Sequence, residues 1–300
     1  MYAIVGASGN TGHIVASRLL EHGQKVRVIG RNASHLQALV QKDAEAVVAD
    51  ASDGAAITKA FTGAKAVYLM IPPNPASPNV RADQDRVTDA LVAAVRGAKV
   101  EHVVVLSSIG ADRSEKTGPV VGLYNLEQKL NALGSLHAVY LRAGYFMENL
   151  LPQAGIIQTF GIMAGPLRGD LKLTMIATQD IGAAAAEALL ALNFTGKQTR
   201  ELLGQRDVSY LETTSIIARA IKRPELAYMQ LGAEQLKPAL TQMGMSPDMA
   251  DLLLEMSDAL NSGYMRALES RTAQNTTPTS LETFVTEQFL PRFNAKAAGA

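Results

Sequence analysis

The chain has 300 residues, which at about 150 residues per domain suits one large domain or two that share a boundary. Its 28 lysines and arginines balance 28 aspartates and glutamates, so no net field attracts nucleic acid or an anionic membrane. There is no cysteine, which excludes disulfides, thiolate nucleophiles and cysteine-bound metal centres, so redox chemistry requires a bound organic cofactor.

The N-terminal half alternates short runs of β-branched residues with helical patterns. This alternation is typical of a parallel sheet that is covered by helices on both faces. Six strands are predicted, at Tyr2–Val5, Lys25–Ile29, Ala46–Ala49, Ala66–Ile71, His102–Leu106 and Ala138–Leu141. We therefore expect an α/β fold with a Rossmann-like, doubly wound parallel sheet that binds NAD(P) in residues 1–150.

The pattern changes after about residue 150. A looser region rich in Gly, Met and Leu covers residues 150–169, and a strand is predicted at Leu171–Ile176. Helical patterns follow at Asp180–Leu192, Tyr210–Lys222, Glu234–Met243, Pro247–Leu268 and Ser280–Phe289. Residues 151–300 are therefore expected to form a smaller, mainly helical substrate lobe, with some segments packing back on the Rossmann core.

Neither a membrane span nor a signal peptide is predicted. No apolar stretch reaches the roughly 18 to 20 residues of a span, because even Ala183–Leu192 is interrupted by Glu187. Met1 leads directly into the first strand, without the basic and long apolar segments of a signal peptide. We expect a cytoplasmic protein that does not bind membranes or nucleic acid.

A glycine-rich turn follows the first strand and opens a helix predicted at Thr11–Glu21. Its glycines allow the backbone to approach a pyrophosphate, while the helix N-terminus offers free N–H donors. The spacing G-x-x-G-x-x-G lacks the Lys-Ser/Thr end of a nucleotide triphosphatase loop, which favours a dinucleotide. The predicted cofactor-binding residues of this turn are Gly6, Ser8, Gly9, Asn10, Thr11 and Gly12.

The residues after the second and third strands bear on the identity of the dinucleotide. NAD-specific proteins usually place an acidic residue after the second strand, whereas this chain has Arg31. Because an arginine pairs with a 2′-phosphate and stacks on adenine, NADP(H) is predicted, with NAD(H) as the alternative. Arg31 can instead be a solvated surface residue. Asp50 and Asp53 are predicted to receive the adenine amino group, with helix capping at least as good an explanation for Asp53.

Two further strand ends are expected to face the nicotinamide. Met70 and Pro72, near the end of the fourth strand, are predicted to form an apolar wall beside it, or only to pack the strand end. Of Ser107 and Ser108, one is expected to point towards the nicotinamide while the other holds the loop. Ser107 is assigned to the cofactor.

Sequence landmarks along the chain resemble the NmrA-like branch of the atypical short-chain dehydrogenase/reductase superfamily, especially its quinone-reductase-like members. In chain order these landmarks are IVGASGNTG, VRVIGRN, VVLSSIGAD, LRAGYFMENL, TQDIGAAAAEAL and TPTSLETFVTEQFLPRF. The resemblance implies a dinucleotide-binding protein. The family includes NAD(P)H-dependent quinone, azo and isoflavonoid-type reductases, and also catalytically silent proteins that bind the dinucleotide and regulate partners.

The usual catalytic pair of the superfamily is incomplete. Typical members use Tyr-x-x-x-Lys, in which lysine lowers the tyrosine pKa. Here Gln128 stands four residues after Tyr124, and Lys129 is rotated about 140° from it on a helix. The resemblance implies that Tyr124 lies at the cleft, where relatives carry a His or Lys. Tyr124 is predicted to donate a proton or hydrogen bond, or to stack on an aromatic substrate; otherwise it is a half-buried helix residue without a chemical role.

The segment between the two lobes carries the predicted substrate contacts. Tyr145, Phe146 and Asn149 form an aromatic surface with a small polar contribution, which suits a planar substrate, or they anchor the second lobe to the first. The five histidines show no paired ligand spacing, so no metal site is predicted. The many methionines of the second half are expected mainly to pack helices, although thioethers also line adaptable pockets.

Two functions follow from these observations. The first is an NADPH-dependent reductase of quinones or related planar carbonyl and azo compounds; a quinone accepts hydride readily, so a complete acid–base pair is less necessary. The second is a non-catalytic NAD(P) redox sensor that acts through a protein partner. The missing lysine favours the sensor, and the apolar cleft favours the reductase.

Overall fold

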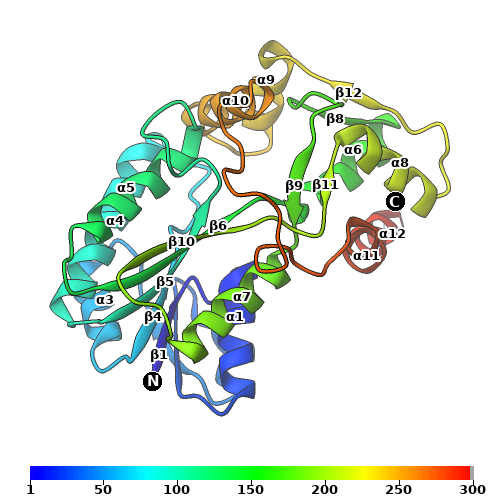
Figure 1. Cartoon of the computed structure of the whole chain (residues 1–300). Helices are drawn as coiled ribbons and strands as arrows, with labels where there is room; N and C mark the ends of the chain where they lie inside the picture. Colours follow the sequence, from blue (N-terminus) through cyan, green and yellow to red (C-terminus); the bar gives the residue numbers. More distant parts are fainter. Residues whose placement is uncertain (298–300) are drawn as a thin grey trace.

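A parallel sheet of seven strands forms the centre of the structure, which a computed structural model describes for residues 1–297 (Figure 1). The strands are β1 (Tyr2–Val5), β2 (Val26–Gly30), β3 (Glu45–Val48), β4 (Ala66–Leu69), β5 (His102–Ser108), β6 (His137–Ala143) and β10 (Lys197–Leu202). Their order across the sheet is β10-β6-β5-β4-β1-β2-β3. The predicted doubly wound parallel sheet is confirmed: β2 and β3 are added on one side of β1, and β4, β5, β6 and β10 on the other.

Helices cover both faces of this sheet (Figure 1). On one face lie α1 (Asn10–Glu21) and α7 (Thr178–Ala191), and on the other lie α3 (Gly54–Phe61), α4 (Val80–Gly97) and α5 (Val121–Asn131). The apolar side chains of β1 and β4 are buried because both strands are sandwiched between the two layers. Gly182 brings α7 close to α1, since a Cβ there would lie 2.6 Å from Ile14 Cγ2.

The edge strand β10 was not predicted. Its sequence, Lys-Gln-Thr-Arg-Glu-Leu, is polar, because its first residues remain exposed or half-buried at the sheet edge. It pairs in parallel with β6, with Lys197 beside Ala138 and Leu202 beside Ala143. A strand from the second half of the chain therefore completes the sheet of the first half.

The second half builds a separate hydrophobic cluster beside the sheet. Its helices are α6 (Gln153–Phe160), α8 (Tyr210–Ala220), α9 (Ala233–Gln242), α10 (Pro247–Asn261), α11 (Leu281–Phe284) and α12 (Leu290–Ala297), with a π-helical turn at Val285–Phe289. Two small sheets accompany them: β7 (Tyr145–Phe146), β9 (Leu173–Ile176) and β11 (Asp207–Val208) form one, and β8 (Met163–Gly165) and β12 (Tyr228–Gln230) form the other. The region is mainly helical, as predicted, and the strand predicted at Leu171–Ile176 is confirmed as β9, but the other four short strands were not predicted.

Several predicted boundaries are wrong. The helix predicted to end at Leu268 ends at Asn261, because Gly263 takes a left-handed conformation with φ +75°. The predicted loose region contains α6, which ends at Gly161 with φ +70°. The division of the chain at residue 150 stays a prediction, and residues 298–300 lie outside the described residues.

Remaining short elements connect the sheet to its surroundings. A 3-10 turn at Ala33–Leu36 and the helix α2 (Gln37–Val40) follow β2, and 3-10 turns lie at Gly118–Val120 and Met147–Leu150. Among residues 1–297, no helix is both long and apolar enough to cross a membrane.

Candidate active site

A cavity of about 1030 Å³ lies at the carboxyl ends of the sheet strands, the position at which open α/β sheets bind ligands. Most of the predicted site residues line it: Gly9, Asn10, Thr11, Arg31, Asp50, Met70, Pro72, Ser107, Tyr145, Phe146 and Asn149. Gly6, Ser8 and Gly12 belong to the turn at one end without being part of the wall. Tyr124 does not line the cavity.

The glycine turn has the close packing that an anion-binding turn needs. Gly6 has φ +68°, and a Cβ on it would lie 2.5 Å from Met70 Sδ. A Cβ on Gly12 would lie 2.3 Å from the Gly6 carbonyl oxygen, so only glycine allows α1 to start this close to the turn. Gly9 is the N-cap and supplies no side-chain acceptor, which leaves the first N–H groups of α1 to a ligand.

Thr11 adds a hydroxyl to this end of the cavity. Its Oγ1 accepts a hydrogen bond of 2.9 Å from the hydroxyl of Tyr68, which is fully buried in β4. Burial raises the pKa of Tyr68, so this phenol stays a hydrogen-bond donor. The proton of Thr11 is therefore available to another acceptor, such as a phosphate oxygen.

Charged side chains gather at the neighbouring nucleotide end. Arg31, Asp50 and Arg86 all line the cavity there, and Arg86 forms an ion pair with Asp83. Asp50 Oδ1 accepts hydrogen bonds from the Ser52 N–H (2.8 Å) and hydroxyl (2.6 Å). These bonds, together with the charges of the two arginines, hold the pKa of Asp50 below its usual value.

Asp53, the other carboxylate predicted here, has a structural explanation. It is the N-cap of α3 and accepts a hydrogen bond of 3.0 Å from the Ala56 N–H. Arg86 was missed because it stands in the middle of α4, where sequence alone does not show which helix face meets the cavity.

A buried polar triad stands behind the cavity wall. Ser107 lines the cavity at the end of β5 and donates a hydrogen bond of 2.5 Å to Glu127 Oε1. Arg142 holds the same carboxylate with two bonds, from Nε to Oε1 (3.1 Å) and from Nη2 to Oε2 (2.6 Å). Burial disfavours the charged guanidinium, but the hydrogen bond and charge of Glu127 outweigh it and raise the pKa of Arg142. Glu127 was not predicted.

Tyr124 was predicted to lie at the cavity, and the structure corrects this prediction. The face of α5 that meets the cavity carries Leu123, one turn after Val120, and its next residue in line is Glu127. Tyr124 is rotated out of this face and stays half-buried outside the wall. The prediction was therefore one residue late on the helix, and a leucine faces the cavity where a proton donor was expected.

The displaced lysine also faces elsewhere. Lys129 Nζ lies 2.5 Å from Asp89 Oδ1 on α4, and Asn125 donates to Asp85 on the same helix. This side of α5 packs against α4 rather than against the cavity. A Tyr-x-x-x-Lys pair is thus absent from the site in geometry as well as in sequence.

The aromatic residues predicted for the substrate do line the cavity. The hydroxyl groups of Tyr145 and Tyr210 lie 2.8 Å apart, with their rings edge to face. Burial raises the pKa of Tyr145, although its hydrogen bonds to Tyr210 and Asn149 oppose this. Phe146 also packs on the core of the large sheet, so contact with the cavity and anchoring of the second half occur together.

Methionines form much of the opposite wall. Alongside Met70, the second half contributes Met245, Met249, Met256 and Met265, from α10 and the segments on either side of it. These four methionines also pack in small hydrophobic clusters, so the two predicted roles, packing and lining a pocket, occur together here. Their unbranched thioethers give this side an apolar and adaptable surface.

The helix α10 lies next to the Rossmann half (Figure 1), and its acidic side chains contact that half. Asp248 Oδ2 accepts a hydrogen bond of 2.8 Å from the Val80 N–H at the start of α4. Glu255 Oε1 accepts one of 3.1 Å from the Gly118 N–H and pairs with Arg81. These contacts hold the methionines over the ends of the strands.

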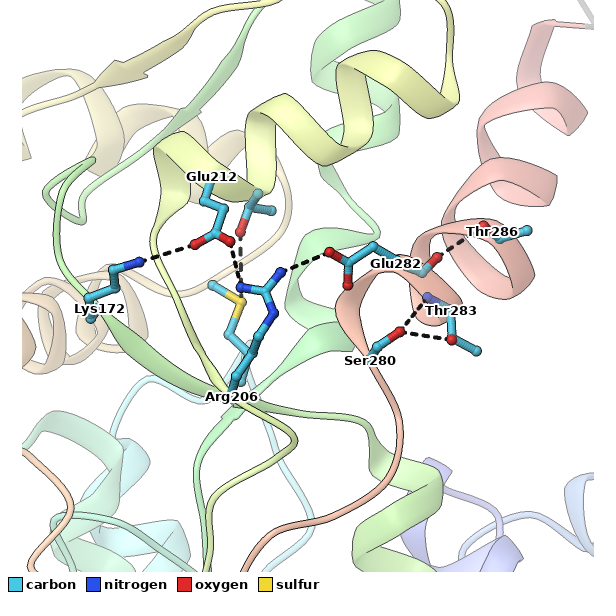
Figure 2. Close-up of polar contacts among 9 residues, drawn as sticks. Lys172, Arg206, Glu212, Ser280, Glu282, Thr283 and Thr286 are labelled. Carbon is cyan, nitrogen blue, oxygen red and sulfur yellow. Dashed lines mark hydrogen bonds and ion pairs between the residues drawn. The ribbon is translucent and has the colours of Figure 1, made fainter. Parts of the chain in front are cut away.

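Figure 2 shows a chain of ion pairs that begins at the cavity wall and ends at the C-terminal helices. Lys172, which lines the cavity, lies 3.1 Å from Glu212 on α8. Glu212 is shared with Arg206, whose other nitrogen lies 2.8 Å from Glu282 on α11. Burial opposes ionisation of Glu212, but hydrogen bonds from Arg206 and Lys172 outweigh it and lower its pKa. The charge of Lys172 is therefore neutralised locally.

Within residues 1–297, no group of three or more His, Cys, Asp or Glu side chains is arranged to hold a metal ion. The donors that do converge on the cavity are backbone N–H groups, hydroxyls and arginines, which suit phosphate oxygens rather than a cation.

A comparison with known families gives a match along almost the whole chain. The model of the NmrA-like family matches residues 2–285. The chain belongs to the NmrA-like family. The resemblance carried by the sequence landmarks is thereby confirmed.

Two characterised relatives of this NmrA-like protein are named as reductases. It is 28% identical over 258 residues to the NAD(P)H azoreductase of Xenophilus azovorans, covering 85% of this chain and 86% of that protein. It is also 28% identical over 267 residues to quinone oxidoreductase 2 of Escherichia coli, covering 88% of this chain and 89% of the relative.

Solved structures share the fold. The NADPH complex of the Escherichia coli quinone oxidoreductase QOR2 superposes with a TM-score of 0.76 at 23% identity, over 96% of this chain and all (100%) of that one. The NADP(H) complex of Citrobacter triphenylmethane reductase gives a TM-score of 0.72 at 18% identity, over 99% and 100% of the two chains. At these identities the likeness concerns the fold.

Proposed function

We propose that this NmrA-like protein is an NADPH-dependent reductase of quinones or related planar carbonyl and azo compounds. The observation that carries the proposal is the single cavity, which runs from an anion-binding glycine turn to an aromatic and methionine-lined end beside Ser107. The relatives named as azoreductase and quinone oxidoreductase share almost the full length of the chain, which supports the same reaction type.

The residues of the cavity fit a phosphorylated dinucleotide. The turn at Gly6–Gly12 and the start of α1 would hold the pyrophosphate, because the glycines leave no room for a Cβ and the N–H groups lack acceptors. Arg31, with Arg86 beside it, would pair with a 2′-phosphate. Met70 and Pro72 would flank the nicotinamide. NADPH supplies the hydride when bound, and the protein supplies position and electrostatics.

The two serine hydroxyls at the reactive end already have acceptors. Ser107 donates to Glu127, and Ser108 donates to the Ile109 carbonyl oxygen at 2.9 Å, so neither serine offers its proton to a substrate. Of the paired Tyr145 and Tyr210 hydroxyls, one donates to the other. This arrangement favours acceptors whose reduced form is a stable anion. A quinone meets this condition because hydride transfer gives a hydroquinone anion, whereas an aliphatic ketone gives a strongly basic alkoxide that needs an acid.

The regulatory alternative rested on the missing Tyr-x-x-x-Lys pair. The names of the relatives give it no support, since they describe oxidoreductases. The partner we propose is a small planar acceptor. The absence of nucleic-acid binding stays a prediction, and a regulatory protein partner belongs only to the alternative. The cytoplasmic location is likewise a proposal, which cell fractionation tests.

The test of the proposed function is NADPH oxidation by the purified chain with naphthoquinone, benzoquinone, an azo dye and an aliphatic ketone. We expect turnover with the quinones that exceeds turnover with the ketone by at least about a hundredfold. Gly12→Ala is the matched negative control, because its Cβ would collide with the Gly6 carbonyl oxygen at 2.3 Å. Tight NADPH binding without turnover of any acceptor would instead establish the sensor.

A further inference from the structure

We propose that Glu127 is a positioning residue that fixes Ser107 as a hydrogen-bond acceptor for the carboxamide N–H of the nicotinamide. The inference rests on the proposed use of NADPH. It assigns a role to a buried carboxylate that the proposed reaction does not otherwise use, and it explains how a cavity without the usual catalytic pair distinguishes the faces of its cofactor.

The first step is the direction of the bond between Ser107 and Glu127. Both side chains are 2% exposed, and the Ser107 hydroxyl lies 2.5 Å from Glu127 Oε1. Arg142 binds both oxygens of Glu127 through two nitrogens, which is the geometry of a guanidinium on a carboxylate. A carboxylate accepts and does not donate, so Ser107 supplies the proton of this bond.

The second step concerns what remains free on Ser107. A hydroxyl has one proton and two lone pairs. With its proton directed at Glu127, Ser107 presents only lone pairs to the cavity that it lines. It therefore accepts hydrogen bonds from N–H or O–H groups and repels carbonyl oxygens. The carboxamide of nicotinamide carries such an N–H donor beside the ring.

The third step is the rigidity of the arrangement. Ser107 and Arg142 are direct partners in the pairing of β5 with β6, so the sheet fixes two corners of the triad. The third corner comes from α5, on the face that Leu123 presents to the cavity. Burying an ion pair costs much of its attraction, so its retention behind the cavity wall suits a positioning role rather than stability alone.

Two dinucleotides that differ at the carboxamide test this proposal. The acetylpyridine analogue of NADP keeps the carbonyl but has a methyl group in place of the NH₂. Calorimetric Kd values for NADP and for this analogue are compared in the wild type, Ser107→Ala, Glu127→Gln and Tyr140→Phe. Tyr140 is the matched control. Its hydroxyl donates to Asn131 at 2.7 Å and contacts the main-chain carbonyl oxygen of Glu127 at 3.4 Å, but it touches neither the Glu127 carboxylate nor the cavity.

We expect the wild type and Tyr140→Phe to bind NADP about tenfold more tightly than the analogue, the value of one hydrogen bond. Ser107→Ala should bring this ratio close to one. Glu127→Gln should do the same, because its amide would donate to Ser107 and turn the serine proton towards the cavity. Ser107→Ala removes no buried charge, so it tests the bond even if Glu127→Gln fails to fold.

Three outcomes would overturn the inference. A wild-type ratio near one shows that the carboxamide N–H has no acceptor, and an unchanged ratio in Ser107→Ala shows that the acceptor is another group. A folded Glu127→Gln that keeps the wild-type ratio shows that the negative charge of Glu127 does not fix the direction of the Ser107 proton. In all three cases NADP still binds, so the proposed function stands. Loss of all binding by the folded wild type would remove both proposals.

Discussion

Single side chains decide which dinucleotide the nucleotide end of the cavity accepts. Arg31 brings a positive charge to this end, Arg86 is paired with Asp83, and Asp50 is occupied by hydrogen bonds from Ser52. A carboxylate that is held in this way does not reach for a ribose hydroxyl as the acidic residue of an NAD-specific protein does. The local charge therefore favours the 2′-phosphate although the whole chain is neutral.

We expect Arg31→Ala to weaken NADPH binding about tenfold or more and to change NADH binding little, because a charge-assisted bond to the 2′-phosphate is lost. Arg31→Lys keeps the charge without the planar guanidinium, so its affinity for NADPH should fall between those of the wild type and Arg31→Ala. Titration of each variant with both cofactors measures the preference. An NADPH-to-NADH affinity ratio that does not change in Arg31→Ala would assign Arg31 to the solvated surface.

The sequence predicts the cofactor residues better than the catalytic ones, for a physical reason. The glycine turn, Arg31 and Ser107 follow strand ends, and all parallel strands end at the same edge of the sheet. Leu123 and Glu127 stand inside a helix, where one residue turns a side chain by about 100°. Tyr124 was chosen for its chemistry, but the rotation of α5 depends on its packing against α4, which the sequence does not show.

The helix α10 approaches the Rossmann half closely at Gly118. Gly118 adopts φ +57°, and a Cβ on it would lie 2.0 Å from the Leu252 carbonyl oxygen. The methionines of the cavity wall are positioned by this close approach and by the bonds of Asp248 and Glu255. The shape of the substrate end therefore depends on the close contact between Gly118 and α10.

Gly118→Ala should displace α10 and raise the quinone KM several-fold, while the Kd for NADPH changes little because the glycine turn is untouched. Gly134→Ala is the matched control, since a Cβ at Gly134 meets nothing within 4 Å. Steady-state kinetics and thermal unfolding measure both effects. A Gly118→Ala variant with the wild-type KM and Tm would show that α10 adapts to the collision.

At the level of elements, the apolar strands, including β9 of the lobe, were predictable, whereas the polar edge strand β10 and the shortest lobe strands were not. Buried central strands such as β1 and β4 show as continuous apolar runs. The polar β10 and the two-residue β7 and β11 carry no such signal, since neighbouring segments rather than their own composition make them strands.

For the molecule as a whole, the cofactor should act as a stabilising ligand. Its proposed site contacts the glycine turn, several strand ends and Arg86 of α4, so binding opposes unfolding of the Rossmann half. NADPH at a hundredfold excess over its Kd should add about 2.7 kcal/mol to the free energy of unfolding. Calorimetry should register this as a rise of several degrees in Tm.

NADH at the same concentration should raise the Tm less, because it lacks the 2′-phosphate. Equal Tm shifts with the two cofactors would contradict the predicted preference for NADPH. No Tm shift with NADPH at saturation would contradict the predicted site.

The position of β10 limits which chimeras can be built from this protein and its relatives. The strand is supplied by residues 197–202 but completes the sheet beside β6, so a fragment of residues 1–150 would leave the β6 edge bare. A bare edge is a template for pairing with other chains. A chimera that takes the substrate lobe of one relative must therefore also take over the strand β10 of the sheet. The transplanted lobe then has to fit both the cavity and the edge of β6.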